Sequence, residues 1–177
     1  MGKRSDFKRR KHDAYFTPIN AVEPLIPHLP TSFNFAEPCA GDGRLMHHID
    51  MLTGSMGLCT LLSDINPADG GVEEADAMDV AIPGNTDFII TNPPWTRRIL
   101  HPMIERFRNI RPTWLLFDGD WMFTKQAKPY LDYCAKIVPT PRIKWIEDSP
   151  YSAKDNTAWF MFQKEKCDTL FCNGDSS

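Results

Sequence analysis

No stretch of the 177-residue chain holds the roughly 18 consecutive apolar residues that a membrane-spanning helix needs, and no secretory hydrophobic segment follows the basic N-terminus. We therefore expect no membrane partner. Internal repeats and low-complexity segments are also missing, so nothing indicates a solenoid or a fibrous fold. With 42% hydrophobic residues, a chain of this length is expected to form one globular domain that buries roughly 70% of its unfolded surface.

Paired cysteines are equally scarce. The sequence has no Cys-x-x-Cys motif and no His pair at zinc-binding spacing. The cysteines are odd in number and scattered along the chain: Cys39, Cys59, Cys134, Cys167 and Cys172. This pattern argues against a disulfide framework and a structural zinc site. We expect reduced thiols, no bound metal and a cytoplasmic protein.

The net charge of −3 conceals an uneven distribution. Segment 3–11 has six Lys or Arg residues and one Asp, a net charge of +5, so the remainder carries −8. A basic arm on an acidic body is typical of a protein with a polyanion partner, although a solvated tail explains the charge equally well. We interpret residues 1–12 as a flexible basic arm, 13–166 as a single domain and 167–177 as a tail.

Short apolar runs alternate with amphipathic segments, which predicts an α/β fold. Strands are expected at 33–37, 58–63, 72–75, 87–91, 113–117, 142–146 and 157–162. Helices are expected at 21–28, 44–52, 97–109 and 129–138. The last two strands would form a hairpin, and the loop 149–156 would join them.

The most distinctive stretch is an apolar strand that ends in Asn92-Pro93-Pro94-Trp95. Prolines have no N–H, so the backbone there offers carbonyl acceptors and almost no donors. Asn92 adds a side-chain acceptor, and Trp95 adds a flat apolar face. Together they suit a planar ring whose amino group donates to Asn92 and to the Pro93 carbonyl while the ring stacks on Trp95. A plain strand followed by a Pro-Pro turn is the alternative.

This tetrapeptide resembles the signature of the S-adenosylmethionine-dependent amino-methyltransferases, especially those that methylate adenine N6 in DNA. Three upstream stretches are similar to motifs of the same family and stand in the family's order: Tyr15-Phe16-Thr17-Pro18, Glu37-Pro38-Cys39-Ala40-Gly41-Asp42-Gly43 and Asp64. The resemblance implies a class I Rossmann-like methyltransferase fold. Such a fold has a seven-stranded, mostly parallel sheet with an antiparallel last strand and helices on both faces.

The resemblance also implies S-adenosylmethionine as the cofactor. In the family, the Tyr-x-Thr-Pro stretch closes over the methionine end, the glycine loop lies against the cofactor, and later acids bind the ribose and the adenine. The cofactor residues implied in this way are Tyr15, Phe16, Thr17, Pro18, Glu37, Pro38, Ala40, Gly41, Gly43, Asp64, Ile65, Asp76, Ala77 and Asn92. Asp76 fits the adenine motif better than Asp79 does. Thr17 and Pro18 are also suited to begin a helix, as N-cap and first residue.

The implied catalytic residues are Asn92, Pro93, Pro94 and Trp95. Four residues are expected near the same sheet edge, where they would contact the target base or its neighbours: Asp120, Trp121, Tyr151 and Asn156. The helix after Trp95 is rich in arginine, which favours a phosphate backbone, but its apolar spacing is that of an ordinary amphipathic helix.

DNA is therefore the expected partner, with RNA as the next candidate. Most DNA enzymes of this family carry a separate target-recognition domain, for which this chain has no room. A compact, phage-like enzyme of low sequence specificity is the implied type. Methylation of RNA adenine, methylation of a protein glutamine, and nucleic-acid binding without catalysis remain open alternatives, and the oligomeric state is not predicted.

Overall fold

The computed structural model describes residues 15–145 and 155–172. The strands are β1 (Phe33–Glu37), β2 (Gly57–Asp64), β3 (Glu73–Glu74), β4 (Phe88–Thr91), β5 (Thr113–Asp118), β6 (Cys134–Pro139), β7 (Thr157–Phe162) and β8 (Leu170–Phe171). The α-helices are α1 (Ile19–Val22), α2 (Arg44–Thr53), α3 (Arg97–Ile110) and α4 (Lys128–Leu131), and the 3-10 helices are η2 (Glu23–His28) and η3 (Gly119–Phe123).

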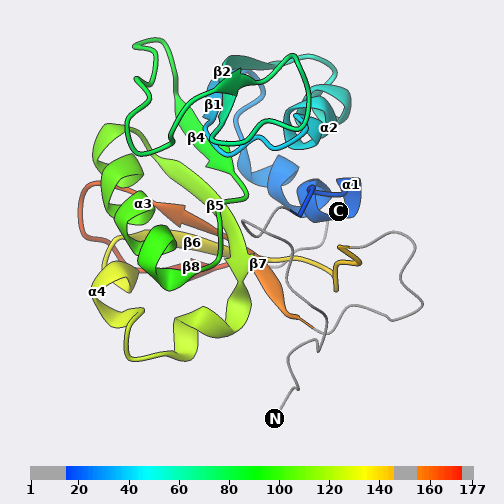
Figure 1. Ribbon diagram of the computed structural model, residues 1–177. Helices are drawn as coiled ribbons and strands as arrows, with labels where there is room; N and C mark the ends of the chain where they lie inside the picture. Colours follow the sequence, from blue (N-terminus) through cyan, green and yellow to red (C-terminus); the bar gives the residue numbers. More distant parts are fainter. Residues whose placement is uncertain (1–14, 146–154, 173–177) are drawn as a thin grey trace.

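The strands form one sheet in the order β3-β2-β1-β4-β5-β7-β6-β8. Neighbouring strands from β3 to β5 run parallel, whereas β7 is antiparallel to both β5 and β6. Helices cover both faces (Figure 1). The predicted fold class is therefore confirmed, including the antiparallel strand beside β5. The described residues hold eight strands instead of seven, because β8 pairs with β6 inside the segment interpreted as a tail.

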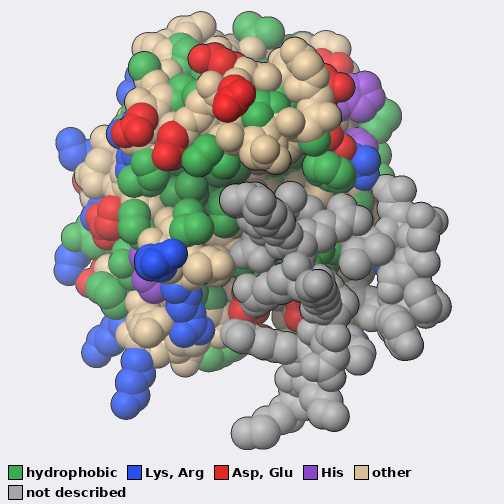
Figure 2. All heavy atoms as spheres, in the orientation of Figure 1, with side chains coloured by type: hydrophobic (Ala, Val, Ile, Leu, Met, Phe, Trp, Pro, Cys, Tyr) green, Lys and Arg blue, Asp and Glu red, His purple; other side chains and the backbone are tan. Residues whose placement is uncertain are grey.

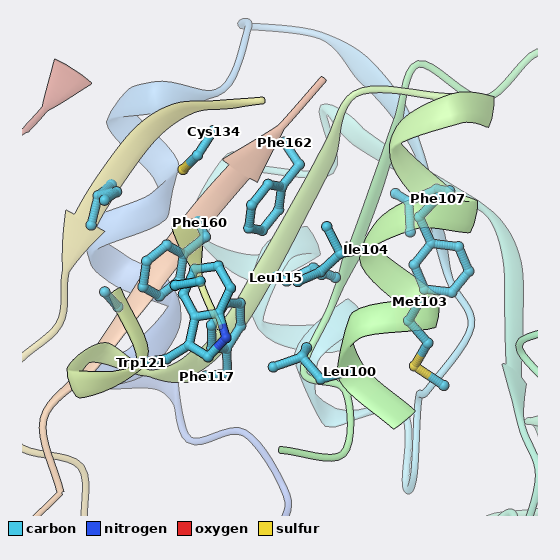
Figure 3. Packing of buried hydrophobic residues seen from close by; sticks show 14 of the residues in the cluster. Leu100, Met103, Ile104, Phe107, Leu115, Phe117, Trp121, Cys134, Phe160 and Phe162 are labelled. Carbon is cyan, nitrogen blue, oxygen red and sulfur yellow. The ribbon is translucent and has the colours of Figure 1, made fainter. Parts of the chain in front are cut away.

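Two hydrophobic layers lie on the two faces of the sheet. On one face, α3 packs against β5 and β7 through Leu100, Ile104, Leu115, Phe117 and Phe160 (Figure 3). On the other, α1, η2 and α2 cover β5 and β1, where Trp114 and Leu116 alternate with the residues of the first layer. A strand buried on both faces needs apolar residues throughout, which explains the continuous apolar run of β5.

The predicted helix 21–28 is only partly correct. A short α1 begins earlier, at Ile19, and passes into the 3-10 helix η2. Pro24 and Pro27 lack the N–H groups that an α-helix would use, so the tighter helix replaces it. The N-cap is Pro18 instead of Thr17, and the Thr17 hydroxyl is thereby available for a contact elsewhere.

The predicted helix 129–138 is wrong beyond Leu131. Residues Cys134–Pro139 form β6, in which Ile137 and Val138 pair with Phe160 and Trp159 of β7. Burial of these β-branched residues in the sheet outweighs the local helical pattern. The predicted strand 142–146 is also wrong, since residues 141–145 adopt no strand, while residue 146 lies outside the described part. In the described part of the chain, no helix is both long and apolar enough to cross a bilayer.

Candidate functional site

A cavity of about 780 Å³ opens where β1, β2 and β4 end. Its volume lies within the usual range for small-molecule sites, roughly 300 to 1,000 Å³. Most residues that the sequence assigned to a cofactor line it: Tyr15, Phe16, Thr17, Glu37, Pro38, Ala40, Gly41, Asp64, Ile65, Asp76, Ala77 and Asn92. Pro94 lines it as well. Of the remaining cofactor and catalytic predictions, Pro18, Pro93 and Trp95 do not line the cavity but adjoin lining residues in the sequence. Gly43 does not line it either, but its N–H donates to the carbonyl of the lining residue Ala40 at 2.8 Å.

The glycine loop after β1 requires its glycines. Gly41 and Gly43 have φ of +59° and +75°, in the left-handed region that residues with a Cβ rarely adopt. A Cβ on Gly41 would lie 3.3 Å from the Phe16 ring. Phe16 therefore packs directly on the loop, and the Arg44 guanidinium lies 5.2 Å from the centre of the same ring. This packing joins the Tyr-x-Thr-Pro stretch to the glycine loop.

The Asp64 carboxylate holds the loop in place. Its Oδ2 accepts a hydrogen bond from the Gly41 N–H at 2.8 Å, and its Oδ1 accepts one from the Asn66 N–H, also at 2.8 Å. A carboxylate oxygen can accept two hydrogen bonds. Each oxygen thus keeps one acceptor position, enough for the two adjacent hydroxyls of a ribose.

Glu37 places a buried carboxyl at the floor of the cavity. Only 1% of the residue is exposed, and its Oε2 accepts from the Met46 N–H at 3.0 Å. Burial raises the pKa of this carboxyl well above its usual 4.5; the Met46 N–H opposes the shift, and the negative charges of Asp42 and Asp64 add to it. Because no cation in residues 15–145 or 155–172 offsets these effects, a ligand with a positively charged group would be favoured here.

The Asn92 amide is oriented by three contacts. Its Nδ2 donates to the Tyr15 carbonyl and to the Thr17 hydroxyl, both at 3.2 Å. Its Oδ1 accepts from the Trp95 indole N–H at 3.2 Å. Both N–H hydrogens are therefore engaged, and the oxygen keeps one acceptor position. The Asn-Pro-Pro-Trp tetrapeptide thus contacts the Tyr-x-Thr-Pro stretch, which lies 75 residues earlier in the chain.

An aromatic cluster adjoins this amide. Trp95 packs edge-on against Trp145, with ring centres 5.5 Å apart, and Trp145 packs edge-on against Tyr15 at 6.4 Å. The Trp145 indole N–H is buried and has no acceptor within the described residues. Sequence reasoning did not single out Trp145, because it was interpreted as part of a strand.

The segment after β3 forms another wall of the cavity. Asp76 is exposed and its Oδ1 accepts from the Met78 N–H at 2.8 Å, while Ala77 is buried. Arg106 of α3 fixes the segment by donating to the Ala77 carbonyl at 3.3 Å and to the Val80 carbonyl at 2.8 Å. Asp79, the alternative to Asp76, does not line the cavity.

The residues expected to contact the substrate lie in different environments. Asp120 is exposed and accepts from the Asn156 amide at 3.2 Å, so these two lie together. Trp121 is only 2% exposed and lies in the core (Figure 3), where its indole donates to the half-buried His101. The expectation for Trp121 is therefore corrected, because its ring is packed away from any ligand. Tyr151 lies outside the described residues.

The sequence analysis missed the contribution of α3. Four of its residues line the cavity: Arg98, Ile99, Pro102 and Met103. The signal was available, since α3 begins two residues after Trp95 and its first turn must stay near the same edge. Within the described residues, no three His, Cys, Asp or Glu side chains lie close enough together to bind a metal ion.

The fold resembles those of several solved structures. A methyltransferase subunit of a type I restriction-modification system from Streptococcus thermophilus matches 90% of this chain and 47% of its own, with TM-score 0.62 and 11% identity. A Listeria monocytogenes protein assigned to the class I S-adenosylmethionine-dependent methyltransferases matches 88% and 62%, with TM-score 0.56 and 12% identity. A dimethyladenosine transferase from Plasmodium falciparum matches 85% and 62%, with TM-score 0.55 and 14% identity.

No protein-family model matches the sequence, and no curated protein sequence matches it. The chain spans about half the length of the streptococcal subunit and less than two thirds of the other two proteins. Identities of 11 to 14% carry an argument about the fold and no further. The chain has the class I methyltransferase fold.

Proposed function

We propose that this chain is an S-adenosylmethionine-dependent methyltransferase that acts on the exocyclic N6 amino group of adenine in DNA. The observation that carries the proposal is the Asn92 amide. Its nitrogen is tied to Tyr15 and Thr17, and its oxygen keeps an acceptor position beside a cavity of cofactor size. Two of the structural neighbours have names that denote a restriction-modification methyltransferase and a dimethyladenosine transferase, and those names agree with this chemistry.

The residues at the cavity fit S-adenosylmethionine. Glu37 would face the cationic part of the cofactor, Asp64 its ribose hydroxyls, and Asp76 with Ala77 its adenine. Bound there, the cofactor would supply a methyl group activated by a sulfonium centre. Phe16 lies over the glycine loop and would cover the cofactor where that loop holds it.

The catalytic strand end would act by orientation. The lone pair of an adenine amino group is delocalised into the ring, so the amine is a poor nucleophile. The Asn92 Oδ1 and the Pro93 carbonyl would accept its two hydrogens, which localises the lone pair on nitrogen and directs it toward the cavity. Both acceptors also stabilise the positive charge that develops on that nitrogen, and their preorganisation costs nothing at the moment of reaction.

The aromatic cluster gives a place for the target base. A base in a duplex must leave the stack to reach Asn92, at a cost of a few kcal/mol that stacking on aromatic side chains offsets. The Trp95 indole donates to Asn92, Trp145 packs edge-on against Trp95, and Tyr15 packs against Trp145.

The test is transfer of labelled methyl from S-adenosylmethionine to duplex DNA, single-stranded DNA, tRNA and total protein. We expect N6-methyladenine in DNA. Asn92→Ala should lower the rate on the order of 10²- to 10³-fold, as the loss of a preorganised polar group at a reacting centre does. The dissociation constant of S-adenosylmethionine should change only a few-fold.

Asn109→Ala is the matched control. The Asn109 amide also donates to a backbone carbonyl, that of Glu105 at 2.7 Å, but it lies near the far end of α3. This variant should keep the wild-type rate. Label in RNA or protein alone would overturn DNA as the substrate, and cofactor binding without any transfer would indicate a non-catalytic protein.

A further inference from the structure

Phe123 is the most exposed large hydrophobic residue in the described chain, with 82% of its surface in contact with solvent. It ends η3, the 3-10 helix that directly follows β5. A single exposed apolar side chain is common on protein surfaces and needs no explanation by itself. Three features distinguish Phe123: its position, the hydrogen bonds that fix its backbone, and the cations near it.

The position of Phe123 is next to the candidate active site. β4 and β5 are parallel neighbours, with Thr91 opposite Leu115, so Asn92 and η3 leave the sheet at the same edge. A direct contact confirms this closeness: Arg97, two residues after Trp95, donates to the Gln126 side chain at 2.8 Å. Phe123 is thus held on the same side of the molecule as the catalytic tetrapeptide.

The turn that presents Phe123 is fixed on both sides. Trp121 is anchored in the core and donates to His101 at 3.0 Å. The Trp121 carbonyl accepts from the N–H of Thr124 at 3.0 Å and from its hydroxyl at 2.8 Å. At the start of η3, the Gly119 N–H donates to the Asn156 carbonyl at 2.8 Å. The backbone that carries the ring is therefore preorganised.

Cations follow Phe123 in the sequence and also begin α3, the helix whose Arg97 contacts Gln126. Lys125 and Lys128 follow Phe123, and Arg97 and Arg98 begin α3. Arg98, Lys125 and Lys128 are exposed and form no salt bridge within the described residues. Figure 2 shows Lys and Arg side chains around the start of α3 and around α4, whereas most of the visible Asp and Glu side chains lie in the upper part of this face and a few lie lower.

We propose that Phe123, Arg98, Lys125 and Lys128, here called the Phe123 surface, bind the DNA strand that flanks the target adenine. The cations contact phosphates, and the Phe123 ring stacks on a base next to the target. This combination of a cationic track and an exposed ring matches the way proteins hold single-stranded nucleic acid. The inference deepens the function proposed above and rests on it.

The test measures DNA binding and methyl transfer separately. Fluorescence anisotropy with a labelled DNA oligonucleotide, as duplex and as single strand, gives the dissociation constant without turnover. Phe123→Ala should weaken binding roughly 5- to 100-fold, the effect of losing one base–aromatic stacking contact. Phe123→Trp should restore it. Lys125→Ala with Lys128→Ala should reduce the slope of log K against log salt by about 2, since each lost phosphate contact removes about 0.9.

Two matched controls lie elsewhere on the fold. Phe171 is also an exposed phenylalanine, at 60%, but on the edge strand β8. Lys164 is an exposed lysine just after β7 ends, at the opposite edge of the sheet from η3. Phe171→Ala and Lys164→Ala should leave DNA affinity and its salt slope unchanged. The melting temperature of Phe123→Ala should equal that of the wild type.

The outcomes separate this inference from the proposed function. If DNA is methylated and Phe123→Ala binds and methylates it as the wild type does, the assignment of the Phe123 surface to DNA binding is wrong and the proposed function stands. If the wild type binds no DNA, both fail. If Phe123→Ala weakens binding of an RNA oligonucleotide but not of DNA, DNA as the occupant is overturned.

Discussion

At the scale of single residues, Glu37 shows a conflict between stability and ligand binding. Its carboxyl is buried and accepts one backbone hydrogen bond, and no cation of the described residues offsets its charge. Its pKa is raised well above 4.5, with burial as the main cause. A group of this kind destabilises the free protein when it is ionised and becomes favourable only when a cationic ligand is bound.

Glu37→Gln should therefore stabilise the ligand-free protein in a pH-dependent way. The folded state binds the Glu37 proton more tightly than the unfolded chain does, so wild-type stability is lost as the pH rises from about 4.5 to the raised pKa. Glutamine cannot ionise and keeps an acceptor for the Met46 N–H. The two proteins should have equal unfolding free energies near pH 4, and the variant should become increasingly the more stable one as the pH rises toward 8.

Urea denaturation across this pH range measures the difference, and calorimetric titration with S-adenosylmethionine should show weaker binding by the variant. A stability difference that stays constant with pH would contradict the ionisation of Glu37 as its cause.

Gly41 and Gly54 form a second residue-scale comparison. Both have φ near +60°, but a Cβ on Gly41 would meet the Phe16 ring at 3.3 Å, whereas one on Gly54 would meet nothing within 4 Å. Alanine at either position should cost about 1–2 kcal/mol of unfolding free energy from the backbone conformation. Gly41→Ala alone should also displace Phe16 and weaken S-adenosylmethionine binding. Equal cofactor affinities in the two variants would mean that contact with Gly41 does not control the position of Phe16 in the cofactor site.

At the scale of elements, α3 does more than cover the sheet. Its apolar side packs on β5, its first turn lines the cavity, and Arg106 in its second half holds the segment that contains Asp76. From the sequence, its arginines were compatible with a phosphate backbone as partner, and its apolar spacing with an ordinary amphipathic helix. Arg106 instead donates to backbone carbonyls inside the protein, and Arg108 is 8% exposed and bonded to Glu105.

Arg106→Ala should release the Asp76 segment from α3. Hydrogen bonds from a charged group contribute about 1.5–3 kcal/mol, so the dissociation constant of S-adenosylmethionine should rise at least about tenfold. Arg111→Ala is the matched control, because Arg111 donates to the Thr86 and Gly84 carbonyls on a turn that does not line the cavity. It should lose comparable stability and keep its cofactor affinity. Similar affinity losses in both variants would point to general unfolding.

Element prediction failed where pairing partners decide the structure. Ile137 and Val138 lie in a segment with helical spacing, yet they form β6 because β7 offers a partner on which both are buried. The strand β7 itself was predicted correctly from its own apolar and aromatic residues. The strand beside it could not be identified from the sequence. A local pattern indicates which residues share a face, but not which strand will pair with that segment.

At the scale of the whole molecule, the fold brings distant motifs to one edge of the sheet. The loop after β1, the acid at the end of β2 and the tetrapeptide after β4 meet there because these strands are parallel neighbours. Crevices at the carboxyl ends of such strands are the usual ligand sites of α/β sheets. Acidic side chains line the cavity at this edge (Glu37, Asp64 and Asp76), and Arg98 belongs both to the cavity wall and to the Phe123 surface.

The sequence by itself determined the class of fold, most strands, and many of the residues that line the cavity, because each of these depends on local features: apolar period, glycine turns and the order of short motifs. Only the tertiary structure decided which side chains touch. Thr17 binds Asn92 across 75 residues, and Trp145 joins Trp95. In η3, Trp121 is buried while Phe123, two residues later, is exposed. Three residues make a turn of a 3-10 helix, so residues two apart point in different directions, and the packing of the core selects which one faces inward.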